Sequence, residues 1–349
     1  MMIKITFPDN SVKEFESGIT PLQIAESISP RLAQEVLAAT VDGQEWDLSR
    51  SINADAAIKL FKWDDPEGKH AFWHSSAHLL AEALQELYPG IKFGIGPAIE
   101  NGFYYDLDRE TPFVAEDLEK IEKEMKKVCK EGKKIYRREI SKAEAMEMFK
   151  DDPYKLDLIE GLEDGNISVY DQGDFTDLCR GPHVDNTKLC KNFKLIKYSG
   201  VYWKGDANNH VMQRIYGVCF PTAEELEAHL QLLEEAKERD HRKIGKDMGL
   251  FMVDDLVGRG LPMFLPKGYV IWQELENYIK NKERKLGYLH VMTPCVGTVD
   301  LYKTSGHWDH YKDNMFPAME VEGESFVLRP MNCPHHMMIY ANRIHSYKD

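Results

Sequence analysis

The sequence of residues 70–88 is HAFWHSSAHLLAEALQELY. Alanine, leucine and glutamate dominate this stretch, and because these residues favour helix we predict one strong helix here. The glycines and proline of Gly94-Ile95-Gly96-Pro97 predict a turn, and the aromatic run Phe103-Tyr104-Tyr105 predicts a strand. A second predicted helix carries a stripe of four apolar residues that is typical of packing against a sheet, namely Leu118, Ile121, Met125 and Val128. With further strands predicted at 167–170, 193–198 and 211–216, residues 63–221 are expected to form an α+β domain with a largely antiparallel sheet.

The regions on either side of this domain have different patterns. Residues 1–62 predict a hairpin, a short helix that begins after Thr20-Pro21 and a second hairpin around Asp42-Gly43, which together make a small β-grasp-like domain. No nucleophile, acid pair or phosphate loop is apparent in it, so an accessory role is the simpler reading. Residues 222–245 predict one linker helix, and residues 246–349 begin a third domain with a helix at 272–285 and a strand at 289–292. The fold class is therefore α+β, with several domains.

Composition limits the classes of function. A chain of 349 residues is long enough for two or three domains, and no apolar run approaches the roughly 20 residues that cross a bilayer. The first residues lack the layout of a secretory signal, so we expect a cytoplasmic protein whose cysteines are reduced thiols or metal ligands rather than disulfides. The net charge of -14 argues against binding DNA or coating RNA through electrostatic attraction alone. Any contact with RNA is expected to be local, and no membrane partner is expected.

Two short motifs bring together residue types that suit hydrolysis or metal binding. His74 and His78 lie four residues apart, which places both imidazoles on one face of the predicted helix. About a hundred residues later, Cys179 and His183 have the same spacing on a turn that contains glycine and proline. Either pair alone is commonly structural, but three imidazoles and one thiol together suit zinc or a pocket that moves protons.

These motifs resemble the editing domain shared by bacterial threonyl-tRNA synthetases and alanyl editing proteins. The preceding β-grasp domain is similar to the TGS domain of the same synthetases, and the resemblance covers all 349 residues. It rests on uncommon strings in a fixed order: His74-xxx-His78, Gly94-Ile95-Gly96-Pro97, Asn101 to Asp106, Cys179-xxx-His183 and Tyr202-Trp203-Lys204-Gly205-Asp206.

The third domain resembles the beginning of a class II synthetase catalytic domain. Residues 286–294 are similar to motif 1, which builds the dimer interface in that class, and the strings 305–316 and 328–334 resemble the threonyl enzyme in particular. The resemblance implies that Cys333 is one ligand of an active-site zinc ion; without it, a buried apolar cysteine is the simpler reading. His335 stands where one common family version has glycine, and motif 2, motif 3 and the remaining zinc ligands are expected after Asp349.

The resemblance also implies an activity. It predicts a threonine–tRNA ligase that uses ATP with Mg²⁺ and one zinc ion per subunit, acts as a homodimer on tRNA-Thr and threonine, and hydrolyses mischarged seryl-tRNA in the editing domain. By the same resemblance, His74, Lys155 and Asp177 are the catalytic residues of editing. His78, Cys179 and His183 line the pocket, and a metal ion there is left open. From the residues alone, an ordinary surface lysine is the simpler reading of Lys155, and a helix-capping or turn residue is the simpler reading of Asp177.

Three other functions remain as alternatives at this point. They are a free-standing trans-editing deacylase, a tRNA-binding regulator without catalysis, and a class II synthetase for another amino acid. The predicted linker helix followed by motif 1 argues against the first. The string Asn332-Cys333-Pro334 argues against the third.

Overall fold

A computed structural model describes residues 1–165, 167–346 and 348. The chain divides into two compact units, Met1–Glu238 and Arg239–Asp349, which are described separately. Among the residues described, no helix is long and apolar enough to cross a membrane.

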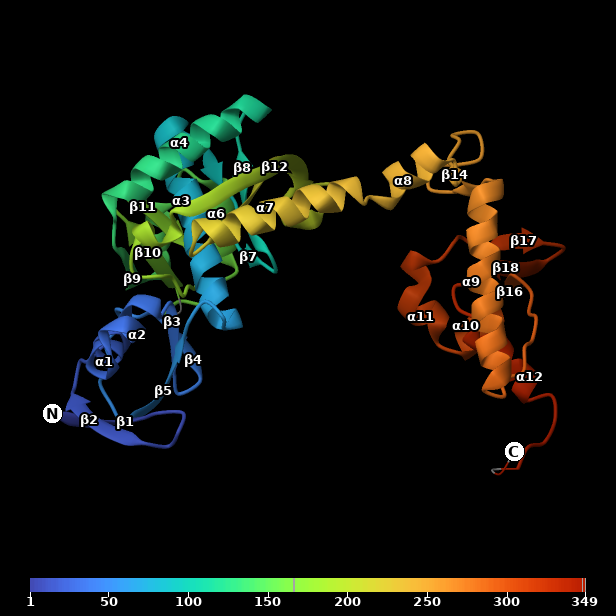
Figure 1. Ribbon diagram of the computed structural model, residues 1–349, viewed down its shortest axis with the longest axis horizontal. Coiled ribbons are helices and arrows are strands. Elements are labelled where there is room, and N and C mark those ends of the chain that lie inside the picture. Colours follow the sequence, from blue (N-terminus) through green and yellow to red (C-terminus); the bar gives the residue numbers. More distant parts are fainter. Residues whose placement is uncertain (166, 347, 349) are drawn as a thin grey trace. The chain divides into compact units, whose positions relative to one another are not determined.

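Residues 1–62 form a five-stranded sheet with two helices (Figure 1). Its elements are β1 Met2–Thr6, β2 Val12–Glu16, α1 Pro21–Ile28, α2 Pro30–Glu35, β3 Ala38–Val41, β4 Gln44–Trp46 and β5 Ala56–Phe61. Both predicted hairpins are confirmed, and the second turns at Asp42 and Gly43, whose positive φ angles of 51° and 79° suit a two-residue turn. The sequence analysis missed α2 and β5. The missed strand β5 is central, because it pairs in parallel with β1 and antiparallel with β3.

The second part of the first unit is built around α3 (Pro66–Leu87), which Figure 1 shows running through its middle. One sheet has the order β12-β13-β8-β6 with β7 beside β8, and a second has the order β11-β10-β9. The strands are β6 Lys92–Phe93, β7 Ala98–Ile99, β8 Gly102–Asp108, β9 Ile135–Ile140, β10 Ile167–Gln172, β11 Phe175–Leu178, β12 Asn192–Tyr202 and β13 Val211–Phe220. The helices are α4 Ala115–Glu131, α5 Lys142–Met148, α6 Pro153–Glu160 and α7 Ala223–Glu238. All the pairings in these two sheets are antiparallel, as predicted.

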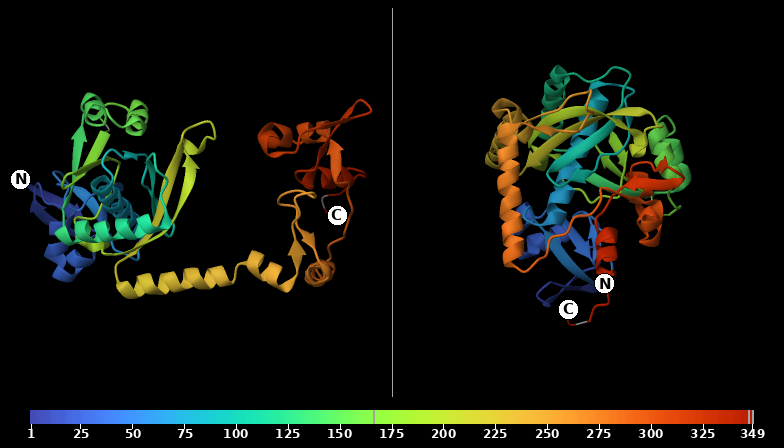
Figure 2. Two further views of the ribbon diagram at one scale, coloured as in Figure 1. Left: turned by 90° about the horizontal axis from the view of Figure 1, so that it is seen from above. Right: turned by 90° about the vertical axis from the view of Figure 1, so that its right-hand side faces the viewer.

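One large core holds α3, α4 and the sheet together. The predicted stripe of α4 is confirmed, since Ile121, Met125 and Val128 are fully buried in this core beside Leu79 and Leu84 of α3. A smaller core lies where α5 and α6 cover β9 and β10, and Figure 2 shows these two short helices in green, apart from α3. The long helix α3 is thus buried over most of its length, which fixes the position of each side chain that it carries.

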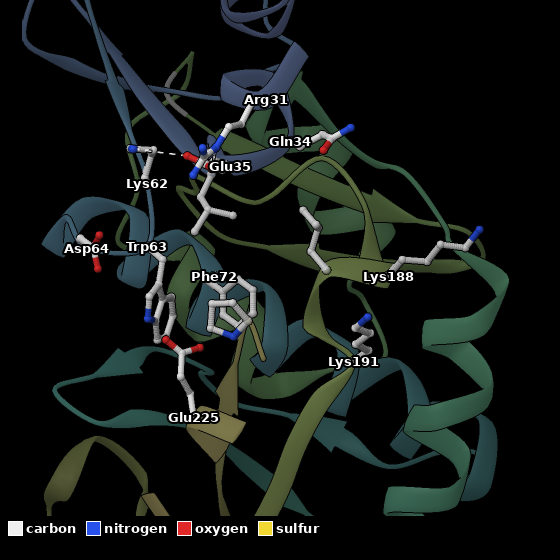
Figure 3. A pocket seen from close by; sticks show the side chains of 13 residues that line it. Arg31, Gln34, Glu35, Lys62, Trp63, Asp64, Phe72, Lys188, Lys191 and Glu225 are labelled. Atoms are coloured by element: carbon white, nitrogen blue, oxygen red, sulfur yellow. Dashed lines mark hydrogen bonds and ion pairs between the residues drawn. The ribbon is translucent and has the colours of Figure 1, made fainter. Parts of the chain in front are cut away.

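The domain of residues 1–62 packs closely on this core. Leu37, which precedes β3, belongs to the large core itself. Beside the contact lies a cavity of about 590 Å³, with Trp63 and Phe72 on one wall and Lys188 and Lys191 on another (Figure 3). Lys62 and Glu35 form an ion pair of 3.3 Å at its edge. The first 62 residues and the editing-like region therefore share one packed unit.

The single helix predicted for 222–245 is wrong. The capping box of Thr222 and Glu225 is present, but α7 ends at Glu238 and a separate helix, α8 (His241–Met248), begins after Asp240. The side chain of Asp240 accepts a hydrogen bond from the main-chain N–H of Arg242 at 2.8 Å. An aspartate that caps a new helix in this way competes with continuation of the old one.

The second unit contains a long helix, α9 (Pro266–Lys285), and two small antiparallel sheets. Its other elements are β14 Phe251–Met252, β15 Met263–Phe264, β16 Val296–Thr298, α10 Val299–Thr304, α11 His307–Tyr311, β17 Met319–Val321, β18 Glu324–Leu328 and α12 Cys333–Tyr340. The strand predicted at 289–292 is not formed. Leu289 and Met292 are 92% and 96% exposed, and in the described part of this unit no strand pairs with them. Without a partner for its backbone, an apolar alternating sequence does not form a ladder.

Candidate functional site

The helix α3 brings His74 and His78 to the same buried face. Their rings lie 5.1 Å apart between centroids, as the spacing of four residues predicts. His78 is completely buried and His74 nearly so. Nδ1 of His74 and both ring nitrogens of His78 lack a hydrogen-bond partner among the described residues. Buried nitrogens without a partner are costly, so these atoms are candidates for contact with a ligand.

The other half of the site lies on the turn that follows β11. Gly181 adopts a φ of +74°, and a Cβ atom at this position would lie 1.9 Å from the hydroxyl oxygen of Tyr170. Only glycine fits here, for both reasons. The turn carries Cys179 and His183 back toward α3, and Sγ of Cys179 lies 3.2 Å from Nε2 of His183.

Ser75 determines the protonation of the His183 ring. Its hydroxyl donates to the carbonyl of Ala71 at 2.7 Å and accepts from the main-chain N–H of Val184 at 2.9 Å. Since the single hydroxyl proton is already used, Nδ1 of His183, at 3.0 Å, must donate to the serine oxygen. This leaves a lone pair on Nε2, on the side that faces Cys179.

The two halves converge on one point. One ligand atom from each of His74, His78, Cys179 and His183 lies within 4.8 Å of the other three. The ring of His183 lies 4.1 Å from the rings of both other histidines. The predicted meeting of the two motifs is therefore seen in the structure. Three imidazoles and a thiol are a donor set that zinc accepts, so the residues fit a metal ion at this point.

A buried carboxylate adjoins this cluster. Asp177 forms an ion pair with Lys155 and accepts a hydrogen bond from the hydroxyl of Tyr105, and its Oδ2 lies 3.4 Å from Nε2 of His78. The Lys155 ammonium also donates to the hydroxyl oxygen of Tyr105 at 3.2 Å. Lys155 and Asp177 are 2% and 3% exposed, which excludes an ordinary surface lysine. A cavity of about 330 Å³ opens beside both residues.

Burial sets the charges of the site. It lowers the pKa of His74 to about 3 and that of His78 to about 4, and it lowers the pKa of His183 well below its usual value. All three rings are therefore neutral at pH 7. Burial alone would raise the pKa of Asp177, but the charge of Lys155 and the hydrogen bonds hold that pKa below its usual value. Burial also raises the pKa of the Cys179 thiol.

The remaining predicted residue, Cys333, lies in the second unit. It is the first residue of α12 and is exposed, so a buried apolar cysteine is excluded. The only grouping of three or more potential metal ligands in the described residues is the one around His74. The assignment of Cys333 as a zinc ligand thus stays a prediction.

Comparison with known proteins bears on this site directly. A family model described as the threonyl and alanyl tRNA synthetase second additional domain matches residues 167–216, and a TGS domain model matches residues 3–62. A threonine–tRNA ligase of Parabacteroides distasonis is 57% identical over 353 residues, covering 100% of this chain and 54% of its own length. One from Anoxybacillus flavithermus is 53% identical over 351 residues, covering 100% of this chain and 55% of its own length. Over its whole length the chain is similar to these threonine–tRNA ligases.

The chain spans about half the length of the curated relatives that it matches. A solved structure, the RNA binding domain of threonyl-tRNA synthetase from Cryptosporidium parvum Iowa II, is 39% identical, covers 32% of this chain and 28% of its own, and superposes with a TM-score of 0.31.

Four residues of the site were missed by the sequence analysis. Ser75 lies between the two histidines of the quoted motif, and Tyr105 lies in the quoted aromatic strand, so both were in view without a role. The ring of Tyr170 lies 4.5 Å from that of His183 and is tilted by 60° to it, and Asp47 reaches the site from the TGS domain. No local pattern marks either of the last two.

Proposed function

We propose that the protein is a threonine–tRNA ligase and that residues 63–221 hydrolyse seryl-tRNA that it has charged in error. The observation that carries the hydrolytic part is the convergence of His74, His78, Cys179 and His183 beside an ionised, buried Asp177. The similarity of the whole chain to threonine–tRNA ligases supports the ligase part.

An enzyme that selects threonine needs such a second site. Serine lacks only one methyl group, and a methyl group is worth about 1–3 kcal/mol of discrimination in binding. Because this factor is too small for accurate translation, a separate site that hydrolyses the seryl ester is the physical remedy.

The reaction requires water to attack the ester carbonyl and the ribose oxygen to leave with a proton. Asp177 is ionised and held rigidly by Lys155 and Tyr105, so it can orient the attacking water. His74 is neutral and has a free ring nitrogen, which suits contact with the terminal ribose and the leaving oxygen. Lys155 would balance the charge that develops on the carbonyl oxygen. Cys179 serves as a wall of the pocket, because hydrolysis needs no covalent intermediate and burial keeps its thiol protonated.

If a metal ion binds at this point, His74, His78, Cys179 and His183 would hold it. A bound zinc ion acidifies water and polarises carbonyl groups. The four residues would then bind and orient the metal ion, and Asp177 would remain the hydrogen-bond acceptor beside them.

For the whole protein we propose the partners that the family resemblance implies. These are tRNA-Thr, threonine, ATP with Mg²⁺ and one zinc ion per subunit, with Cys333 as a ligand, in a cytoplasmic homodimer that pairs through 286–294. The exposed apolar side chains of Leu289 and Met292 support that interface. We propose domains at 1–62, 63–221 and 246–349, and the linker predicted at 222–245 contains α7 and the first part of α8 in place of one helix.

The test is release of radiolabelled serine from seryl-tRNA-Thr by this chain. We expect hydrolysis by the wild type, and loss of about 100-fold or more in kcat for His74→Ala and Lys155→Ala. Lys204→Ala is the matched control, since this lysine is half-exposed and pairs with Asp157 at 2.8 Å. Circular dichroism verifies that each variant is folded. Retained activity in folded His74→Ala and Lys155→Ala would refute the assignment, and tRNA binding without any hydrolysis by the wild type would favour the regulator.

A further inference from the structure

Asp47 of the TGS domain contacts the editing-like site directly. It follows β4 and is 6% exposed, although it belongs to a domain in which the sequence suggests no chemistry. Its Oδ1 accepts a hydrogen bond from the main-chain N–H of His183 at 3.0 Å. Its Oδ2 accepts one from the hydroxyl of Tyr170 at 2.8 Å. A single carboxylate thus joins two residues that lie more than 120 positions away from it in the sequence.

Both contacts help to hold His183 in place. The main-chain bond fixes His183 at the end of the Cys179 turn, and the Tyr170 ring lies 4.5 Å from the His183 imidazole. The Tyr170 hydroxyl also packs against Gly181, where a methyl group would clash at 1.9 Å. Asp47 and Ser75 therefore hold His183 from two sides, the first through its backbone and the second through Nδ1.

The carboxylate is buried but not isolated. Burial raises the pKa of Asp47 above its usual value, and the hydrogen bonds from His183 and Tyr170 and the charges of Arg137 and Arg50 offset only part of that rise. Arg50 comes from the TGS domain and lies 3.6 Å from Glu139 of β9, while Arg137, also in β9, binds the same glutamate at 2.6 Å. A buried carboxylate that accepts two hydrogen bonds and lies near guanidinium groups is held in one position, unlike a carboxylate on a solvated surface.

We propose that Asp47 is a positioning residue through which the TGS domain sets the place of Cys179 and His183 opposite His74 and His78. The proposal rests on the proposed hydrolysis of seryl-tRNA and adds to it that the active arrangement needs residues 1–62. A positional error of about 1 Å in a catalytic group can cost about 100-fold in rate, so one lost anchor is enough to matter.

Asp47 could also be a plain structural contact between two domains. If Asp47 were only a structural contact, its replacement would lower the free energy of unfolding without changing the kcat of the folded protein. A positioning role instead lowers kcat with little change in KM, and it loosens the Cys179 turn in the folded protein. These two readouts separate the possibilities.

The experiment compares Asp47→Asn with Asp55→Asn in the full chain. Asp55 belongs to the same domain and accepts a main-chain hydrogen bond from Lys4 at 2.8 Å, but it does not contact the site. For Asp47→Asn we expect kcat for serine release to fall about 10- to 100-fold with KM nearly constant, and no such fall for Asp55→Asn. Tyr170→Phe should give part of the loss, and the double variant should lose less than the product of the two, because both act through one bond.

A second measurement does not depend on hydrolysis. The alkylation rate of Cys179, followed by mass spectrometry of its peptide and divided by the rate of exposed Cys295, reports how firmly the turn is held. We expect this ratio to rise severalfold in Asp47→Asn and to stay at the wild-type value in Asp55→Asn. An unchanged ratio together with an unchanged kcat would overturn the proposal. If the wild type does not hydrolyse seryl-tRNA, the proposed function fails while the alkylation ratio still decides whether Asp47 anchors the turn. If Asp47→Asn does not fold, Tyr170→Phe carries the same comparison.

Discussion

Replacement of Lys155 by methionine tests the electrostatics of the site most directly. Lys155 and Asp177 form an ion pair that is almost completely buried, and methionine is an unbranched side chain, one atom shorter than lysine, that lacks the charge. Breaking a buried pair by removing one partner costs about 3–5 kcal/mol, because the remaining charge is left without compensation. Since Tyr105 and the N–H of Leu178 still donate to Asp177, we expect the lower end, about 3 kcal/mol of unfolding free energy.

The loss of unfolding free energy in Lys155→Met should depend on pH and on whether Asp177 carries its charge. In the wild type the pKa of Asp177 is lowered, so its stabilising effect is present above the unfolded value and disappears as the pH falls. In Lys155→Met the carboxylate is destabilising while ionised, so the difference from wild type should shrink as the pH falls. The double variant Lys155→Met/Asp177→Asn, which removes both charges, should recover most of the loss.

Hydrogen exchange as a function of urea, read by mass spectrometry on peptides of β8 and β11, measures this free energy within the first unit. Lys204→Met is the control, because its pair with Asp157 is half-exposed and should be worth less than about 1 kcal/mol. If Lys155→Met is no less stable than Lys204→Met, the buried pair does not have the energy inferred from its burial.

Two further changes test the packing and the charge of the same site. Gly181→Ala combines a positive φ with a clash against Tyr170, so it should lower the free energy of unfolding by more than Gly205→Ala does. Gly205 has a φ of +75° but open space around it, so its replacement should cost about 1–2 kcal/mol. Equal losses of unfolding free energy, measured by hydrogen exchange, would contradict the clash. In metal-free protein, the free energy of unfolding should fall as the pH drops from 6.5 toward 4, because His74 and His78 bind protons in the unfolded chain but stay neutral when buried. The expected slope is about 1.4 kcal/mol per pH unit for each histidine. An unchanged slope in His78→Asn would count against this cause.

Much of the architecture follows from local pattern. The long helix with its two histidines, the apolar stripe of α4 and both hairpins of the first domain are set by propensity, periodicity and turn residues, which are properties of neighbours in the chain. The pattern failed where a competing local signal or a missing partner decided the outcome. Asp240 caps a new helix inside the predicted linker, and residues 289–292 alternate like a strand without a neighbour to pair with.

The features of the site also divide into those that follow from local sequence and those that depend on tertiary contacts. The sequence by itself determined which residue types are available, since His74 and His78 must share a helix face and Cys179 and His183 must share a turn. Only the tertiary structure decided that these two pairs meet, that Lys155 is buried against Asp177, and that Asp47 reaches them from another domain. The reason is physical: helix and turn geometry is fixed by bonds over a few residues, whereas burial and charge compensation depend on contacts between segments that the chain brings together only when the core closes.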